Sequence, residues 1–311
     1  LQILLPSGKP LYYITNNGVA AETISTNKVY SGGVAGLSLD GTGITFYEWD
    51  SGRARTTHKE FGSRVTIADT GNNTLSDHST HVAGTMMAAG IDASAQGMSY
   101  AALLMDHDWN NDESEMATAG AAGALISNHS YSFIHGWDWN YFGDNKWAWF
   151  GDINIDPQEE AWFGYYSASS AEWDQIAYLA PSLLICKSAG NDRDDNGPNP
   201  GEQYWVYDGA WVLSTEPRDP DGPWDCIGTR GICKNILTVG AVNDILGGYT
   251  NVSQVVATNF SSWGPPDDGR IKPDITANGQ HLKSPVSSAD DAYSYMSGTS
   301  MSSPSAAGSI G

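Results

Sequence analysis

Basic residues are scarce in this chain. Its 311 residues include 15 Lys and Arg against 36 Asp and Glu, which gives a formal net charge of −21. Nucleic-acid binding requires a basic surface, so this balance argues against a nucleic-acid partner. No stretch of 18 apolar residues is present, and the sequence therefore predicts no transmembrane helix. The first ten residues, LQILLPSGKP, are too short and too poorly flanked for a signal peptide, so a secreted protein would already have lost its targeting segment.

Cysteine is also rare, with three residues in the whole chain. Cys226 and Cys233 stand close together in CIGTRGIC, a loop-like stretch, and this spacing predicts a short-loop disulfide. Two free thiols, or half of a metal site without visible partner ligands, are the alternatives. Cys186 lies within the apolar run SLLICKSAG, which indicates a small buried apolar residue.

What the chain does contain is an alternation of apolar strands with helices rich in small residues, without internal repeats or low-complexity linkers. This alternation predicts an α/β fold with a mostly parallel central sheet and helices on both faces. Functional groups in such sheets gather at the carboxyl ends of the strands. Residues 43–49, 101–107 and 234–242 are expected to be strands, and residues 80–90 and 299–311 are expected to be helices. Residues 114–130 and 171–191 are each expected to form a helix followed by a strand.

Two long stretches interrupt the alternation. Residues 133–170 are very rich in aromatic side chains, and residues 192–232 are rich in Asp, Gly and Pro. Both are predicted to be ordered surface insertions in a domain spanning 41–311, preceded by an N-terminal extension, 1–40, packed on its body. The aromatic insertion is interpreted as a wall of a binding cleft, as a satellite hydrophobic cluster that fixes the insertion to the body, or as both.

Three separated segments place a reactive side chain among Gly, Ser and Thr: YEWDSGRARTTHKEF (47–61), DHSTHVAGT (77–85) and GTSMSSP (298–304). A serine hydroxyl is a poor nucleophile at neutral pH. It needs a histidine base within reach, and that histidine needs a carboxylate to fix its tautomer and stabilise its cation. Asp, His and Ser are present here in that chain order.

These segments resemble the conserved blocks of the subtilisin-family (subtilase) serine peptidases. HSTHVAGT is similar to the family's histidine block, GTSMSSP to its serine block, KSAGN to its oxyanion block, and WDSG followed by His58 to its aspartate block. FSSWGP (260–265) and DGRIKPDITANG (268–279) match further family segments. The order and rough spacing agree over residues 40–311, so the resemblance implies a subtilisin-like fold.

The resemblance also implies catalytic roles. Ser300 would be the nucleophile, His78 the general base and then the general acid, and Asp50 the residue that orients His78. Asn191 would donate its side-chain amide to the tetrahedral oxyanion, together with the backbone N–H of Ser300. The implied activity is that of a secreted serine endopeptidase that hydrolyses peptide bonds of proteins through an acyl-enzyme. A catalytically inactive homologue that acts as a protein-binding module, or a peptide ligase on the same scaffold, are the alternatives.

By the same resemblance, two short segments should pair with extended substrate backbone and flank the pocket for the residue before the scissile bond. The substrate-binding residues implied in this way are Ser130, Tyr131, Ser132, Ser188, Ala189 and Gly190. The identity of the preferred residue is left open. The aromatic insertion favours large apolar side chains, whereas the acidic surface favours basic substrates.

Three residues near the histidine block compete for catalytic roles. Asp69, in IADTG, also fits the aspartate block, but it follows a polar, half-exposed segment, whereas Asp50 follows an apolar run, so Asp50 is preferred. His81 is expected to be structural, with a His-x-x-His metal pair as the alternative, because no third ligand has a recognisable spacing. Asp77 is expected to be the N-cap of the helix.

A structural calcium ion is expected from the acidic composition, with no cofactor needed for catalysis. The acidic segments 192–202 and 108–115 could supply its oxygen ligands, or they could be solvated loops, and no ligand set is assigned. Only 11 residues follow Ser300. Because relatives continue beyond this helix, the resemblance leads us to expect a companion C-terminal segment of the same precursor.

Overall fold

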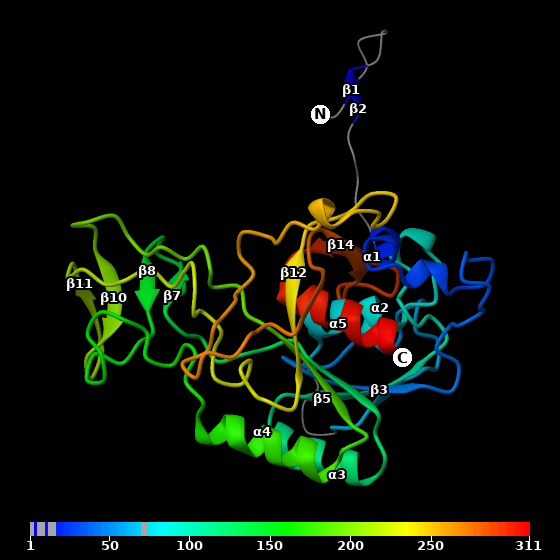
Figure 1. Ribbon diagram of the computed structural model, residues 1–311, viewed down its shortest axis with the longest axis horizontal. Helices are drawn as coiled ribbons and strands as arrows, with labels where there is room; N and C mark the ends of the chain where they lie inside the picture. The colour runs from blue at the N-terminus through cyan, green and yellow to red at the C-terminus, as the bar shows by residue number, and fades with distance from the viewer. Residues whose placement is uncertain (1–2, 5–9, 12–16, 70–73) are drawn as a thin grey trace.

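The computed structural model describes residues 3–4, 10–11, 17–69 and 74–311 (Figure 1). The strands are β1 (Ile3–Leu4), β2 (Pro10–Leu11), β3 (Thr45–Asp50), β4 (Val65–Ile67), β5 (Leu103–Asp108), β6 (Ile126–His129), β7 (Trp137–Trp139), β8 (Trp147–Trp149), β9 (Leu184–Ser188), β10 (Tyr204–Tyr207), β11 (Trp211–Ser214), β12 (Leu237–Val242), β13 (Ile275–Asn278), β14 (Leu282–Pro285) and β15 (Tyr293–Met296). The α-helices are α1 (Asn17–Thr23), α2 (Asp77–Met87), α3 (Asp112–Ala121), α4 (Ala168–Leu179) and α5 (Thr299–Ile310), and short 3-10 turns lie at Thr26–Lys28, Ala93–Ala95 and Val252–Gln254.

The central sheet has seven strands in the order β13-β12-β9-β6-β3-β5-β4, and all six pairings between neighbours are parallel. The strand order reverses at β3, which lies between β5 and β6 although both follow it in sequence. The predicted α/β fold with a mostly parallel sheet is therefore confirmed. Each strand expected from the sequence is present, and the short strands β4 and β13 at the two edges are additional.

Side chains of the sheet alternate between two hydrophobic layers, as the two-residue period of a strand requires. Along β3, Phe46 packs into the layer that contains α2 and α5, whereas Trp49 packs into the layer that contains α3 and α4. Figure 1 shows these two pairs of helices on opposite sides of the sheet. Both faces are thus covered, which explains why the central strands read as nearly continuous apolar runs.

The two insertions meet in a second sheet of four strands, in the order β11-β10-β8-β7. Strands β7 and β8 come from the aromatic insertion, and β10 and β11 come from the acidic one. Trp137, Trp149 and Tyr204 form a small core beneath this sheet, which projects to the left of the body in Figure 1. The satellite hydrophobic cluster predicted for the aromatic insertion is therefore present.

The N-terminal helix α1 packs against α5 and β14, and Val19, Ala20 and Ala21 are buried in this contact. Strands β1 and β2 pair with each other in antiparallel register. None of the helices in the described part of the chain has both the length and the apolar character needed to cross a membrane.

Candidate active site

The carboxyl ends of three adjacent central strands form the base of the site. Trp49 is paired with His129, and His129 is paired with Lys187. The next residues along these strands, Asp50, Ser130 and Ser188, therefore lie side by side at one edge of the sheet, at the spacing of neighbouring strands. This edge is where a parallel sheet collects functional groups.

Asp50 and His78 are hydrogen-bonded to each other. His78 is the second residue of α2, and its Nδ1 lies 2.7 Å from Oδ1 and 2.9 Å from Oδ2 of Asp50. Asp50 is fully buried, and its Oδ1 also accepts hydrogen bonds from the backbone and hydroxyl of Ser51. Burial acts to lower the pKa of His78, but the charge and hydrogen bond of Asp50 outweigh this effect and raise it.

Ser300, the second residue of α5, is hydrogen-bonded to Ser130, which follows the neighbouring strand β6. Its Oγ donates to the carbonyl oxygen of Ser130 at 3.0 Å, and the Ser130 hydroxyl donates to the carbonyl oxygen of Ser300 at 2.9 Å. No hydrogen bond joins Ser300 to His78, so the Ser300 hydroxyl must leave the Ser130 carbonyl oxygen before it can transfer a proton to His78. Hydrogen bonds between catalytic groups commonly form only when substrate is present.

Asn191 is oriented by the residue that precedes Ser300. Its Oδ1 accepts hydrogen bonds from the backbone N–H of Thr299 at 2.8 Å and from the Thr299 hydroxyl at 3.0 Å. Because the carbonyl end of the amide is occupied, the Nδ2 end is turned outward and donates to no described residue. Asn191 therefore presents a fixed N–H donor beside the start of α5.

The competing residues have other contacts. Asp69 accepts a hydrogen bond from the backbone of Asp108 at 2.6 Å, so it closes the end of β4 on β5 and does not contact His78. His81 is buried, and its Nε2 lies 3.0 Å from the carbonyl oxygen of Leu282. Burial lowers the pKa of His81 to about 4, which keeps the ring neutral, as expected of a structural histidine.

The prediction that Asp77 caps α2 is wrong. The N-cap is Ser76, whose hydroxyl accepts from the backbone N–H of Ser79 at 3.1 Å. Asp77 is the first residue of the helix and accepts hydrogen bonds from the backbone and hydroxyl of Ser287. A carboxylate in the first turn still interacts favourably with the helix dipole.

A cavity of about 290 Å³ opens beside Ser300 and Asn191. Of the residues predicted to bind substrate, Ser130, Tyr131, Ser132, Ser188 and Gly190 line it. Ala189 does not, because its side chain is buried against Ile227 and Ile232. The aromatic insertion contributes Phe133, Trp137 and Trp139 to the wall. Both interpretations of the insertion, cleft wall and satellite cluster, therefore apply.

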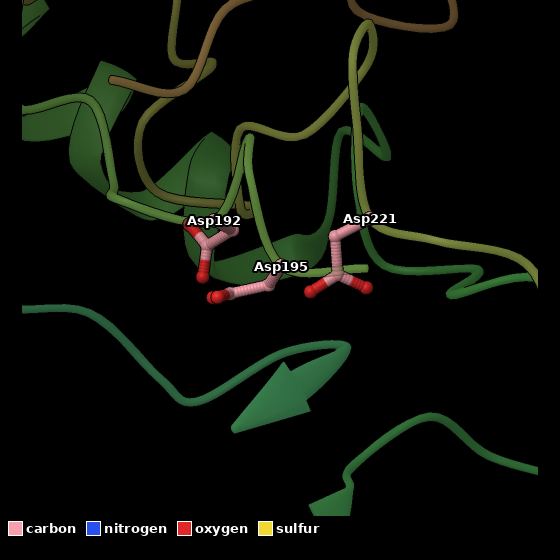
Figure 2. A group of neighbouring side chains, drawn as sticks. All are labelled: Asp192, Asp195 and Asp221. Atoms are coloured by element: carbon pink, nitrogen blue, oxygen red, sulfur yellow. The ribbon is translucent and has the colours of Figure 1, made fainter. Parts of the chain in front are cut away.

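Three acidic residues that the sequence did not assign to the substrate pocket also line this cavity: Asp138, Asp192 and Asp195. Asp221 lies next to them, and carboxyl oxygens of Asp192, Asp195 and Asp221 lie within 4.8 Å of one another (Figure 2). The acidic run DRDD directly after Asn191 was the available signal, but the sequence linked it only to calcium. These three carboxylates are the group of acidic side chains in the described residues that could hold a metal ion, and the calcium prediction stays a prediction.

The second acidic segment, 108–115, has its carboxylates engaged elsewhere. Arg230 forms ion pairs with Asp112, at 2.8 Å, and with Glu113. Asp108 accepts two hydrogen bonds from Asn110. These contacts stabilise the loop, and among the described residues this segment holds no group of three converging acidic side chains.

The predicted disulfide between Cys226 and Cys233 is absent, and both are free, buried thiols, as is Cys186. The two side chains lie in different surroundings. Cys226 donates to the carbonyl oxygen of Trp263 at 3.5 Å, whereas Cys233 packs in the hydrophobic layer with Trp173 and Ile185. Short separation along the chain therefore did not bring the sulfur atoms together.

Among curated proteins, the C5a peptidase of Streptococcus pyogenes serotype M3 is 44% identical to this chain over 78 residues, which are 25% of this chain. The C5a peptidase of serotype M18 is 54% identical over 54 residues. The matched segments span 6% and 4% of the lengths of those proteins, so the likeness is local.

Solved structures share the fold. The CspB protease of Clostridium perfringens superposes with a TM-score of 0.60 at 15% identity, covering 93% of this chain and 85% of that one. The prenylagaramide maturation protease PagA superposes with a TM-score of 0.52 at 19% identity, covering 85% of this chain and 72% of that one. Residues 25–311 match the sequence model of the subtilase family.

Proposed function

The chain belongs to the subtilase family, and from this membership and the site geometry we propose that it is a serine endopeptidase acting on protein or peptide substrates. The observation that carries the proposal is the hydrogen bond between Asp50 and His78. It lies at the sheet edge where Ser300, at the start of α5, is hydrogen-bonded to Ser130. A buried carboxylate paired with one ring nitrogen of a histidine leaves the other nitrogen free to act as a base.

In the proposed reaction, the Ser300 hydroxyl turns from the Ser130 carbonyl toward His78 and attacks the scissile carbonyl carbon. His78 takes the hydroxyl proton while Asp50 stabilises the resulting imidazolium. The tetrahedral oxyanion is held by the Asn191 side-chain amide and the Ser300 backbone N–H. His78 then protonates the leaving amine, and a water molecule hydrolyses the acyl-enzyme by the same steps in reverse.

The test is a Ser300→Ala variant compared with Ser302→Ala, a substitution two residues along the same helix. We expect Ser300→Ala to abolish both peptide hydrolysis and covalent labelling by a fluorophosphonate, and Ser302→Ala to retain both. Labelling of another serine would refute the assignment of the nucleophile. Stoichiometric capture of a protein without turnover or labelling would instead support a catalytically inactive binding module.

We also propose that the enzyme acts outside the cell. The support is the family resemblance together with the strongly acidic composition, which favours solubility. Immunodetection in the culture medium of the native source, compared with the cell fraction, tests this. A structural calcium ion likewise stays a proposal, which a calcium-dependent rise in Tm would support.

A further inference from the structure

The cavity beside Ser300 has an acidic lining without basic partners. Asp138, Asp192 and Asp195 line it, and Asp221 lies next to them. Not one of these four carboxylates forms an ion pair with a Lys or Arg in the described part of the chain. Buried charges of one sign are costly unless a counter-charge is supplied. The four carboxyl groups therefore favour a cationic occupant of the cavity.

The crowding of the carboxyl groups supports this point. Burial, reinforced by the charges of neighbouring Asp residues, raises the pKa of Asp195 to about 7. Burial likewise raises the pKa of Asp192 to about 6 and that of Asp221 to about 10. Figure 2 shows the three side chains next to one another, with Asp192 and Asp195 on one loop and Asp221 on a second segment.

A second, independent feature of the cavity wall is His135. Its side chain is only 8% exposed, and its Nε2 has no hydrogen-bond partner among the described residues, although His135 lines the cavity. Burial lowers the pKa of His135 to about 4, so the ring is neutral at pH 7. This nitrogen is shielded from solvent and packs toward Gly228, so His135 contributes an uncharged part of the wall.

Part of the remaining wall is apolar and aromatic. Phe133, Ile134 and Trp137 line the same space. Lysine and arginine side chains combine an apolar stem with a charged tip, and aromatic faces attract cations. The nearby Lys187 does not fill this role, because it lies behind the wall, where its ammonium group donates to the carbonyl oxygen and the hydroxyl of Ser188.

Resting on the proposed peptidase function, we propose that this cavity receives an arginine or lysine side chain from the residue before the scissile bond, and that Asp138, Asp192 and Asp195 select it. The cavity adjoins Ser300 and Asn191, so a side chain inside it belongs to a residue whose carbonyl can reach the nucleophile. The enzyme then cleaves after basic residues, and the aromatic insertion serves to hold the stem of the basic side chain.

A divalent cation would be less fully coordinated in this cavity than a basic side chain would be paired. Asp192 already accepts a hydrogen bond from Ser262 at 3.0 Å, and Asp221 accepts one from the backbone of Trp137 at 2.7 Å. The oxygens left over are too few for a calcium ion held by protein alone.

The experiment uses one peptide sequence with arginine, lysine, citrulline or leucine before the scissile bond. Citrulline keeps the shape of arginine and removes its charge. We expect kcat/KM to be about 10- to 100-fold higher for arginine than for citrulline, the range of a hydrogen bond to a charged group. Asp195→Asn should remove most of this ratio. Asp208→Asn, an exposed carboxylate in the β10–β11 turn, should leave it intact.

A binding measurement separates this inference from the proposed function. The fluorescent cation p-aminobenzamidine is titrated into Ser300→Ala, which needs no activity. Saturable binding that Asp195→Asn weakens at least tenfold supports the acidic pocket even if no peptide is cleaved. Equal cleavage after arginine and citrulline, or preference for leucine, overturns it. So does an Asp195→Asn variant that loses a calcium-dependent rise in Tm while its cleavage preference stays unchanged.

Discussion

At the residue scale, the imidazole of His78 must be neutral to take the proton of Ser300, so the pKa of His78 sets the lower pH limit of activity. Asp50 raises this pKa against the opposing effect of burial. We therefore expect kcat/KM to rise with pH, with a midpoint above the ordinary histidine value of about 6.5. A pH profile measured with one peptide substrate checks this, and a midpoint below 6 would contradict it.

Replacement of Asp50 by Asn should lower kcat by about 10⁴-fold, the loss found when the same change is made in a serine peptidase of unrelated fold. The amide favours the wrong histidine tautomer and cannot stabilise the imidazolium. The matched control is Asp69→Asn, because that residue only closes a strand end. A large loss in Asp69→Asn together with an active Asp50→Asn would reverse the assignment.

Asn191→Ala should lower kcat by about 10²- to 10³-fold and leave KM nearly unchanged. This magnitude is the one known for subtilisin, a member of the same family. The reason is that the amide is aimed at charge that develops only in the transition state. Asn196→Ala, at an exposed position on the same loop, serves as control. A raised KM with normal kcat would assign Asn191 to substrate binding instead.

At the element scale, α5 carries Ser300 and is held in place by close packing on α2. A Cβ at Gly308 would lie 2.8 Å from the Cβ of Met98 and 3.1 Å from the Cα of Met86. Glycine is therefore needed at this helix crossing, although alanine is the better helix former. Ser302, Ser303 and Ser305, which are also buried, keep the rest of the helix thin enough to pack.

We expect Gly308→Ala to destabilise the protein by about 1–3 kcal/mol, the usual cost of overpacking a core. Activity should fall as well, because a shift of α5 moves Ser300 relative to His78. Urea unfolding and kcat/KM are the measurements, and Ile310→Ala, at an exposed position of the same helix, is the control. If Gly308→Ala were more stable than the wild type, the higher helix propensity of alanine would outweigh the close contact of its Cβ with Met98 and Met86.

At the scale of the whole molecule, two buried carboxyl groups link stability to pH. Glu48 and Asp106 are paired neighbours on β3 and β5 and are fully buried. Burial, with their mutual charge, raises the pKa of Glu48 well above its ordinary value, and burial raises that of Asp106 to about 7. Their protonated forms are therefore favoured in the folded state, so their contribution to stability falls as pH rises above their unfolded pKa values.

Glu48→Gln should consequently gain stability relative to the wild type as pH rises from 5 to 8, by up to about 1.4 kcal/mol per pH unit. Other buried groups, including Lys187 and His81, also titrate, so the quantity to compare is the difference between the two proteins at each pH. Urea unfolding at several pH values measures it. Glu172→Gln, at an exposed site on α4, should show no such trend, and a constant difference for Glu48→Gln would contradict the expectation.

The sequence by itself determined how the central strands and helices follow one another along the chain, and which residues stand at the strand ends. Apolar runs, Pro and Gly stops, and small-residue helices are local patterns, and a parallel sheet brings the carboxyl ends of its strands to one edge. Asp50 was separable from Asp69 for this reason, since only Asp50 ends a buried strand. The positions of His78, Asn191 and Ser300 beside that edge were expected from the family resemblance.

Only the tertiary structure decided what depends on contacts between distant segments. The parallel pairing of β8 with β10 joins the two insertions into one sheet, and the acidic cavity brings Asp138 of one insertion together with Asp192 and Asp195 of the other. The free thiols of Cys226 and Cys233 were likewise unpredictable from their spacing. Local sequence patterns indicate the periodicity and the ends of a helix or strand. Pairing between distant segments depends on packing across the whole core, which a local pattern does not contain.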